Sequence, residues 1–297
     1  MTTIDLTAIE PPDVVETLDF EEIYQDLIEH YKGIYPEWTA ALESDPVVKL
    51  LELVAYRELR LRARVNDAAR SVMLAFSTGT TLEHLAALFG IKRLAIKPTD
   101  PEGGDELKEK DDDLRSRTQL APQGYSVAGP EGAYRSHALN ADGRVLSVSV
   151  ISPAPCEIVV TILSREGDGT ASDELVAIVT KALRADDVRP LAEKVTVRGA
   201  EIIRYRIRAT LKFFAGPDRS VVLAESRKRV QQYADDMHRM DMEVTPDGLY
   251  AAIRVPGVQK VILETPPDGI KVTKQQASFC TGIELIDGGV YDGGEYQ

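Results

Sequence analysis

The sequence predicts an α+β protein, in which an N-terminal long-helix arm precedes two small α/β units with mixed sheets. One observation is a run of helically spaced apolar residues from 47 to 76, after Pro46, that contains no Gly or Pro. The other is the alternation of β-branched stretches with helical patterns beyond residue 130. A hydrophobic fraction of 43% and a charged fraction of 28% are typical of chains that bury a core.

The length of 297 residues is enough for two or three compact units. We expect five segments: a helical arm at 1–97, an acidic linker at 98–128, a middle α/β domain at 129–200, a C-terminal α/β domain at 201–265 and an extended tail at 266–297.

Start signals define the helices of the arm. Asp19 is expected to cap a helix that runs to about Tyr31, before Gly33 and Pro36 interrupt the pattern. Ser44 or Asp45, followed by Pro46, is a strong start for the helix at 46–76, which Gly79 closes. At about 1.5 Å per residue this helix is a rod of roughly 45 Å. A second helix at 80–89 is expected, with Thr80 and Glu83 at capping-box spacing.

The long helix carries an apolar stripe at spacings of three, four and seven residues. Its members are Val47, Leu50, Val54, Leu61, Val65, Ala68 and Val72. The opposite side carries Arg57, Arg60, Arg62, Arg64 and Arg70. The stripe is wider than the short neighbouring helix can bury, so we expect it to contact a partner protein.

The remaining elements follow in order. The linker is rich in acids, Pro and Gly, with one or two helical turns around 111–119. Helices are expected at 132–140, 173–184, 220–238 and after Thr245-Pro246, and strands at 145–151, 158–163, 195–198, 203–213 and 258–263. The last thirty residues contain Pro266-Pro267 and two Gly-Gly pairs, which favours a tail with little core of its own.

Charge and composition disfavour several classes of function. A net charge of −13 repels phosphate backbones, and an aromatic content of 6% leaves few platforms for stacking bases, so we expect no nucleic-acid binding. No apolar run reaches eighteen residues and the first ten residues lack a signal-peptide pattern, which predicts no membrane span and a cytoplasmic chain. Two distant cysteines, Cys156 and Cys280, fit a reducing compartment.

Motifs for catalysis are weak, and we expect a protein that is not an enzyme, with no cofactor and no metal. No Gly-x-Ser-x-Gly elbow is present. The four histidines, His30, His84, His137 and His238, have no partner at helical spacing, which favours solvated or capping roles over metal ligation. The alternative is a cytoplasmic nucleotide- or metal-dependent enzyme, because Gly103-Gly104-Asp105-Glu106 matches the diguanylate cyclase signature. Leu107 replaces the aromatic fifth residue, and no strand precedes the motif, so we interpret it as a chance match.

A second candidate surface is a basic stripe on the strand at 203–213. Side chains alternate along a strand, so one face presents Arg204, Arg206, Arg208 and Lys212. One interpretation is a solvated outer face of the sheet. The other is a docking stripe for an acidic neighbour, such as another copy of this acidic chain.

The arm and the segments after it also carry a series of short motifs. They are Asp45-Pro46, Leu50-Leu51-Glu52, Ala55-Tyr56-Arg57-Glu58, Arg62-x-Arg64-Val65-Asn66, Ser71-Val72-Met73-Leu74-Ala75, Gly79-Thr80-Thr81-Leu82-Glu83-His84-Leu85-Ala86, Asp113-Leu114-Arg115-Ser116-Arg117, Leu120-Ala121-Pro122-Gln123-Gly124-Tyr125-Ser126, Ala128-Gly129-Pro130-Glu131-Gly132-Ala133-Tyr134 and Val188-Arg189-Pro190-Leu191. Together these motifs resemble the baseplate assembly protein J family of contractile-tailed phages and related injection systems. The resemblance spans about residues 19–265; the acidic stretch at 98–112 and the tail match weakly.

The resemblance implies a structural role as a baseplate wedge subunit of a contractile phage tail or a tail-like particle. It implies assembly with a smaller wedge protein, called I, through a helical bundle that includes the arm. It also implies contact with other copies of the chain, as a dimer within a wedge and as a ring between wedges around the hub. Sheath-initiator and hub proteins are further expected partners, and the implied location is the baseplate of a particle assembled in the bacterial cytoplasm.

Overall fold

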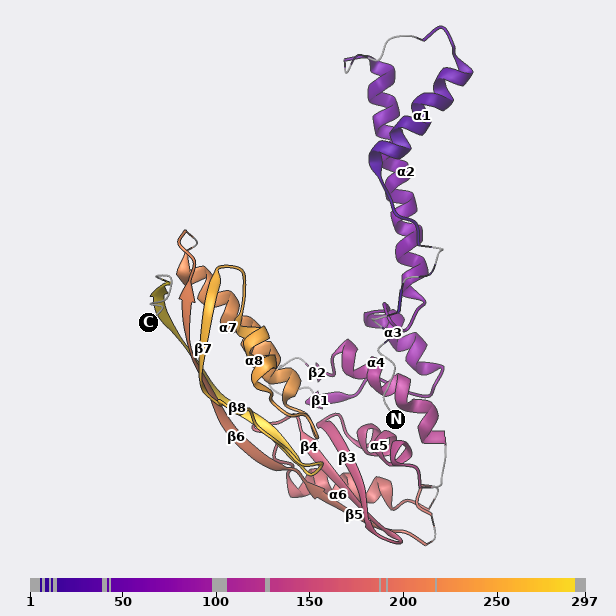
Figure 1. Ribbon diagram of the computed structural model, residues 1–297. Coiled ribbons are helices and arrows are strands. Elements are labelled where there is room, and N and C mark those ends of the chain that lie inside the picture. The colour runs from indigo at the N-terminus through magenta and orange to yellow at the C-terminus, as the bar shows by residue number, and fades with distance from the viewer. Residues whose placement is uncertain are drawn as a thin grey trace. The chain divides into compact units, whose positions relative to one another are not determined.

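The computed structural model describes residues 6–291, apart from 7, 8, 11, 13, 14, 39–41, 43, 98–105, 126–128, 187, 191 and 217. It mixes helices with small mixed sheets after an N-terminal helical region, which confirms the predicted fold class (Figure 1). The chain divides into two compact units. Unit 1 comprises Met1–Lys92 and Lys110–Gln119, and unit 2 comprises Arg93–Glu109 and Leu120–Gln297.

Unit 1 is helical and begins with α1 (Phe20–Ile34) and α2 (Pro46–Ser71). Both predicted start signals are confirmed. The carboxylate of Asp19 accepts a hydrogen bond from the amide of Glu21 at 2.7 Å, and that of Asp45 accepts from the amide of Val47 at 2.8 Å. These bonds satisfy amides that have no partner within their helices, so each helix starts at a defined residue.

The helix α2 ends at Ser71, five residues before the predicted end, and α3 (Gly79–Ala87) follows a short turn. The predicted capping box is wrong, because Thr78 is the N-cap of α3. The turn is fixed by Arg115 of α4 (Asp111–Leu120), whose guanidinium donates to the carbonyl oxygens of Leu74 at 2.9 Å and Ser77 at 2.8 Å. Two carbonyl oxygens of the turn between α2 and α3 thus have a charged donor, which stabilises the turn.

The helical turns predicted around 111–119 are confirmed as α4, but residues 106–125 are not a linker. In α4, Leu114 and Thr118 are buried, and in unit 2 the strand β2 (Leu107–Lys108) pairs antiparallel with β1 (Ala95–Lys97). A 3₁₀ helix, η2 (Ala121–Tyr125), follows. These residues are packed parts of the two units, while 98–105 and 126–128 lie outside the described residues.

The first sheet of unit 2 has the order β3–β4–β5 and forms with two helices the predicted middle α/β domain. Its elements are α5 (Glu131–Ala141), β3 (Val145–Ala154), β4 (Glu157–Ser164), α6 (Asp173–Leu183) and β5 (Lys194–Gly199). β4 pairs antiparallel with β3 and parallel with β5, and α6 provides the crossover between β4 and β5. Val160, Val179 and Leu183 are fully buried in the core between this sheet and its helices.

The second sheet of unit 2 has the order β7–β6–β8. Its elements are β6 (Glu201–Phe213), α7 (Arg219–Met237), α8 (Pro246–Ile253), β7 (Val258–Thr265) and β8 (Gln276–Val290). α7 and α8 lie along one face of this sheet (Figure 1), where Ile207, Leu211 and Phe213 are buried against Leu249 and Ile253. We call this the inner face of the β7–β6–β8 sheet and the opposite one its outer face.

The predicted extended tail at 266–297 is wrong for most of its length. β8 pairs parallel with the whole of β6, from Glu201↔Gln276 to Phe213↔Val290, and Ala277 and Ser278 are buried. Its alternating Cys280, Ile283 and Leu285 pack on the inner-face core. The glycines of β8 resemble the composition of a loop, and the bulge opposite Arg206 interrupts the alternation of its side chains. For these two reasons the sequence did not indicate a strand here.

The two sheets of unit 2 share a small core of Leu163, Ala200, Met240 and Ala277. At the same place the amide of Met240 donates to the hydroxyl of Ser147 at 3.3 Å. The ring of His238 lies against Phe279, with its Nδ1 atom 2.6 Å from the carbonyl oxygen of Ser278. The shared core and the hydrogen bond between Met240 and Ser147 join the two predicted α/β domains into one unit.

Candidate partner interface

One side of α2 is covered within unit 1. Val48 and Ala55 are buried on it, together with Ile23 and Ile28 of α1. The absence of a large side chain at Ala55 allows α1 to approach closely. This packing fixes the rotation of α2, and therefore decides which of its apolar side chains face away from α1.

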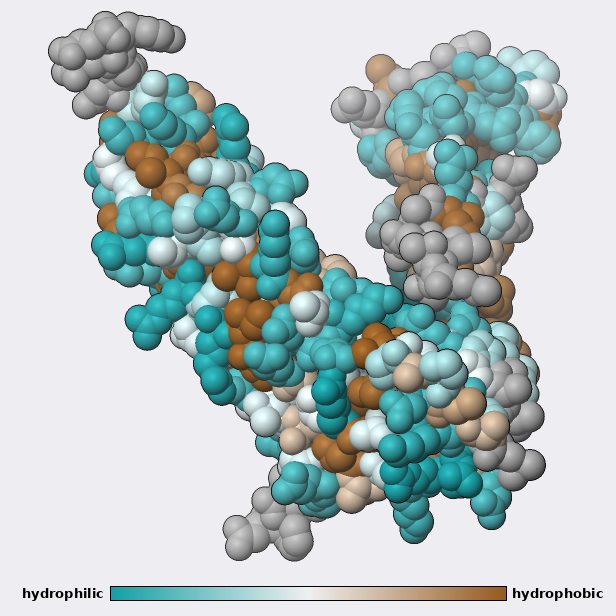
Figure 2. Space-filling view, turned by 60° about the horizontal axis from the view of Figure 1, so that its bottom comes forward, coloured by the Kyte–Doolittle hydropathy of each residue, from teal (hydrophilic) through white to brown (hydrophobic). Residues whose placement is uncertain are grey.

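The predicted apolar stripe faces away from α1. Six of its seven residues are exposed, and Leu61, Val65 and Val72 have 64%, 61% and 67% of their surface accessible. Val47 is the exception, because it is half-buried. Leu53 and Tyr56, which lie outside the predicted stripe, are also exposed. On the face seen in Figure 2, hydrophobic residues form brown patches among hydrophilic ones.

Five of the six exposed residues of the stripe follow a heptad. Val54, Leu61 and Ala68 are seven residues apart, and so are Val65 and Val72, four residues after Leu61 and Ala68. Alternating steps of three and four residues keep apolar side chains along one line of a helix, which is the seam on which another helix packs. The surface therefore suits a helical partner.

Arginines flank this seam. Arg57 and Arg64 are seven residues apart and exposed, and within the described residues neither has an acidic partner. Arg62, on the side of α1, is instead paired with Glu58 at 2.6 Å and with Glu16 at 3.6 Å. Two free guanidinium groups beside an apolar seam favour a partner helix with acidic residues at its edge.

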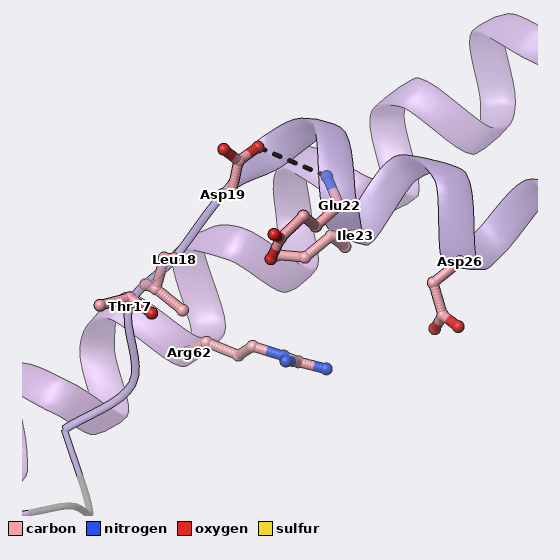
Figure 3. Close-up of a pocket in the computed structure, with 7 residues that line it drawn as sticks. All are labelled: Thr17, Leu18, Asp19, Glu22, Ile23, Asp26 and Arg62. Atoms are coloured by element: carbon pink, nitrogen blue, oxygen red, sulfur yellow. Dashed lines mark hydrogen bonds between the residues drawn. The ribbon is translucent and has the colours of Figure 1, made fainter.

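Asn66 holds the segment before α1 against α2. Its side-chain oxygen accepts a hydrogen bond from the amide of Glu16 at 3.1 Å, and its Nδ2 atom donates to the carbonyl oxygen of Glu16 at 2.8 Å. Next to this clamp, at the start of α1, lies a hollow of about 160 Å³ (Figure 3). The residues that line the hollow are Thr17, Leu18, Asp19, Glu22, Ile23, Asp26 and Arg62.

Replacing Asn66 by alanine is expected to loosen the arm without unfolding unit 2. The backbone N–H and C=O of Glu16 would both lose their partner, which costs about 1–3 kcal/mol for partly buried groups. Hydrogen exchange at Glu16 and Thr17 is expected to speed up accordingly, while an Asp67→Ala control, at an exposed neighbour, leaves it unchanged. Unchanged exchange in Asn66→Ala would show that the clamp does not hold the segment.

The predicted basic stripe lies on the outer face of the β7–β6–β8 sheet, and two of its four cations are neutralised within the chain. Arg204 pairs with Asp168, and Arg208 pairs with Glu264 at 3.0 Å and with Glu284 at 3.7 Å. Arg206 and Lys212 have no acidic partner among the described residues. Sequence alternation predicted the shared face, but the acids come from distant segments.

The Asp168 carboxylate predicts a specific acid sensitivity. Hydrogen bonds from the hydroxyl and the amide of Thr170, with the charge of Arg204, lower the pKa of Asp168 from 3.8 to about 2. The ionised Asp168 carboxylate therefore stabilises the folded protein. This contribution to the free energy of unfolding is complete above pH 3.8 and is lost as the pH falls through about 2. Asp168→Asn is expected to melt at a lower temperature than the parent at pH 7, and the difference should shrink between pH 4 and pH 2. A constant difference would contradict this linkage.

The described residues show little that resembles a catalytic site. They contain no group of three or more His, Cys, Asp or Glu side chains placed to hold a metal ion. His30 and His84 are exposed, and burial raises the pKa of the Cys280 thiol, which disfavours a nucleophilic thiolate. The Gly103-Gly104-Asp105 part of the cyclase-like motif lies outside the described residues. No described helix is both long and apolar enough to span a bilayer.

The chain is similar to several known proteins. The chain is 44% identical to baseplate protein J of Escherichia phage P2 over 299 residues, which cover 97% of this chain and 99% of that protein. Residues 43–100 match a model of the baseplate J-like N-terminal domain, and residues 126–199 match one of the baseplate J-like central domain. A chain in the solved baseplate of the anti-feeding prophage aligns with 17% identity and a TM-score of 0.37, over 60% of this chain and 43% of its own length.

Proposed function

The chain belongs to the baseplate J-like family, and we propose from this membership that it is a structural wedge subunit in the baseplate of a contractile phage tail or a tail-like particle. Near-full-length similarity to a baseplate protein of a contractile-tailed phage supports this role. In the proposal the chain acts by packing against other proteins, and no catalytic step is assigned to it.

The observation that carries the proposed mode of action is the exposed apolar stripe of α2. Leu50, Val54, Leu61, Val65 and Val72 each expose between 46% and 67% of their surface, on a helix whose other side is already packed. Burying a side chain of this size stabilises a contact by about 1.5–3 kcal/mol. The stripe is therefore able to hold a partner helix even after the cost of ordering it.

We assign the partners of the arm from the family resemblance and from the charges beside the stripe. The smaller wedge protein I and a second copy of this chain are the proposed occupants, as a helical bundle within the wedge. Arg57 and Arg64 favour an occupant with acidic residues at the edge of its apolar seam. The α/β elements of unit 2 are then free to link neighbouring wedges into a ring around the hub.

The proposed location is the baseplate of the particle, with assembly in the bacterial cytoplasm. Contacts with sheath-initiator and hub proteins belong to this proposal as well. A membrane or a nucleic acid is not among the proposed partners, because the net charge is −13 and no described helix is suited to span a bilayer.

The test is the native mass of the chain alone and after co-expression with the proposed wedge protein I. We expect a stable complex that contains both proteins and more than one copy of this chain. The competing enzyme interpretation predicts thermal stabilisation by Mg²⁺, Zn²⁺ or a nucleotide, and we expect no shift in melting temperature with any of them. A chain that stays monomeric and does not bind the wedge protein would contradict the proposal.

A further inference from the structure

Two lysines on the outer face of the β7–β6–β8 sheet have no acid to balance them. Lys212 of β6 and Lys260 of β7 lie directly opposite each other in the antiparallel ladder. Opposed side chains have Cβ atoms about 5 Å apart, and like charges at such positions destabilise a sheet. Within the described residues neither lysine has an acidic partner. The lysine pair, as we call Lys212 and Lys260, therefore lowers the stability of the chain on its own.

The surroundings of the lysine pair leave it without a carboxylate. On the other flank of Lys212 lies Gly288 of β8, where a Cβ atom would be 3.3 Å from Cγ of Lys212, so no side chain shields the lysine there. Glu264, the acidic residue of β7, is already engaged. Its carboxylate accepts a hydrogen bond from the hydroxyl of Thr210 at 2.8 Å and pairs with Arg208 at 3.0 Å. Since no carboxylate of the described residues is left for the lysine pair, another molecule has to supply it.

The first sheet of unit 2 shows how the same kind of position is balanced within the chain. Lys194 of β5 lies opposite Glu157 of β4, and its Nζ atom is 3.7 Å from a carboxylate oxygen of Glu157. On the β7–β6–β8 sheet a second lysine stands where the first sheet has a glutamate. Position 260 thus holds a residue that the fold itself does not favour, which indicates a role in binding.

An apolar row lies next to the lysine pair. Thr210 of β6 is opposite Ile262 of β7 on one side and Ile286 of β8 on the other, and Ile262 exposes 41% of its surface. α7 and α8 both lie on the inner face, and no described helix of unit 2 covers this row (Figure 1). Residues two apart along a strand are separated by about 7 Å. A molecule that binds here therefore contacts the lysine pair and, at that distance, the apolar row.

We infer that this part of the outer face is a docking surface for an acidic segment of a different protein, in which a carboxylate lies next to an apolar side chain. The carboxylate accepts hydrogen bonds from both lysines, and the apolar side chain covers Ile262. At a separation of about 7 Å, these two groups of the partner are two residues apart on a strand or about four apart on a helix. The charges fix the register of the contact, and the apolar contact adds affinity.

Other occupants fit the surface less well. The same face of a second copy is repelled, since four cations and two carboxylates surround the apolar row: Arg206, Arg208, Lys212, Lys260, Glu264 and Glu284. A nucleic acid or an anionic bilayer would supply phosphates, but the net charge of −13 repels an extended array of them. A short acidic segment of a protein brings few charges and also supplies the apolar contact.

Lysine footprinting of the full free chain tests the surface without any baseplate. The probe is the capped peptide Glu-Val-Glu-Val-Glu at millimolar concentration, and acetylation of each lysine by an amine-reactive ester is followed by mass spectrometry. We expect the peptide to slow acetylation of Lys212 and Lys260 at least about threefold. Lys194, which Glu157 already pairs, is the internal control and should change little. A peptide with Gln in place of Glu should protect no lysine.

Several results of the footprinting would overturn the inference. One is a lack of protection at Lys212 and Lys260, and another is equal protection by the Gln peptide. A further one is stronger protection by a short DNA duplex or by vesicles that contain phosphatidylglycerol, which would assign the surface to a phosphate-bearing ligand instead.

The variant Lys260→Glu separates binding from folding. It places a carboxylate opposite Lys212, as Glu157 stands opposite Lys194, so the melting temperature of the free chain should rise by about 1–3 °C. The same variant should lose the protection of Lys212 by the acidic peptide. Lys228→Glu, at an exposed site on α7, changes the net charge equally and should alter neither result. Retained protection in Lys260→Glu, or a lower melting temperature, would contradict the inference.

Zero-length cross-linking then identifies the partner. A carbodiimide joins a lysine amine to a carboxylate only where the two are in contact. In the assembled particle we expect Lys212 or Lys260 to be linked to Asp or Glu of a different protein. Links only to another copy of this chain, or no links from an assembled particle, would refute the assignment. Absence of the chain from the particle, with the peptide protection intact, would refute the proposed function and leave this surface standing.

Discussion

Replacing Leu61 by aspartate is expected to abolish co-purification of the chain with its wedge partner. Leu61 lies in the middle of the apolar stripe and exposes 64% of its surface, so the substitution removes no contact on which the arm itself depends. In the complex the new carboxylate would be buried in an apolar seam without a partner. The lost apolar contact and the desolvation of the charge together cost about 4 kcal/mol or more, which is about a thousandfold in Kd.

The measurement is a pull-down from co-expression, with quantitative titration of the purified proteins. Circular dichroism and the melting temperature of the variant alone should match those of the parent. Val221→Asp provides a matched control, because Val221 exposes 65% of its surface on α7, far from the arm in sequence. A folded Leu61→Asp chain that still binds the wedge protein with parental affinity would refute the assignment of the stripe as the interface.

Local signals were sufficient to predict most elements. Asp19, and Asp45 with Pro46, mark the starts of α1 and α2 because they satisfy backbone amides from within their own segment. The alternation from Ile203 to Phe213 predicted β6 and both of its faces, since the period of a strand is independent of what covers it.

Long-range contacts account for what the sequence did not predict. The turn after α2 is held by Arg115, which binds its carbonyl oxygens from about forty residues away, so no local pattern indicated it. The same limit applies to the candidate surfaces. Helical spacing predicted the stripe, but it did not predict that Val47 is half-buried or that Leu53 and Tyr56 are exposed beside it. Strand alternation predicted the basic stripe, but not the acids from other segments that neutralise half of it.

The strand β8 was the largest omission, and its removal is expected to have the largest effect on stability. A chain that ends at Lys274 loses every partner of β6 on that side of the sheet, from Gln276 to Val290. It also loses the fully buried Ala277 and exposes the apolar edge of the inner-face core. At about 25 cal/mol per Å² of exposed apolar surface, with the lost hydrogen bonds, the cost exceeds roughly 5 kcal/mol, as much as many domains have in total.

We therefore expect the chain that ends at Lys274 to lose the cooperative unfolding transition of unit 2, and to be largely insoluble or protease-sensitive there. The helices of unit 1 should stay protected, because their core of Ile23, Ile28, Val48 and Ala55 contains no residue of β8. Limited proteolysis with mass spectrometry separates the two results, and a chain that ends at Tyr291, with β8 intact, is the matched control. If β8 were an appended tail, the two truncated chains would melt at the same temperature. If β8 is an integral strand, only the longer chain keeps a folded unit 2.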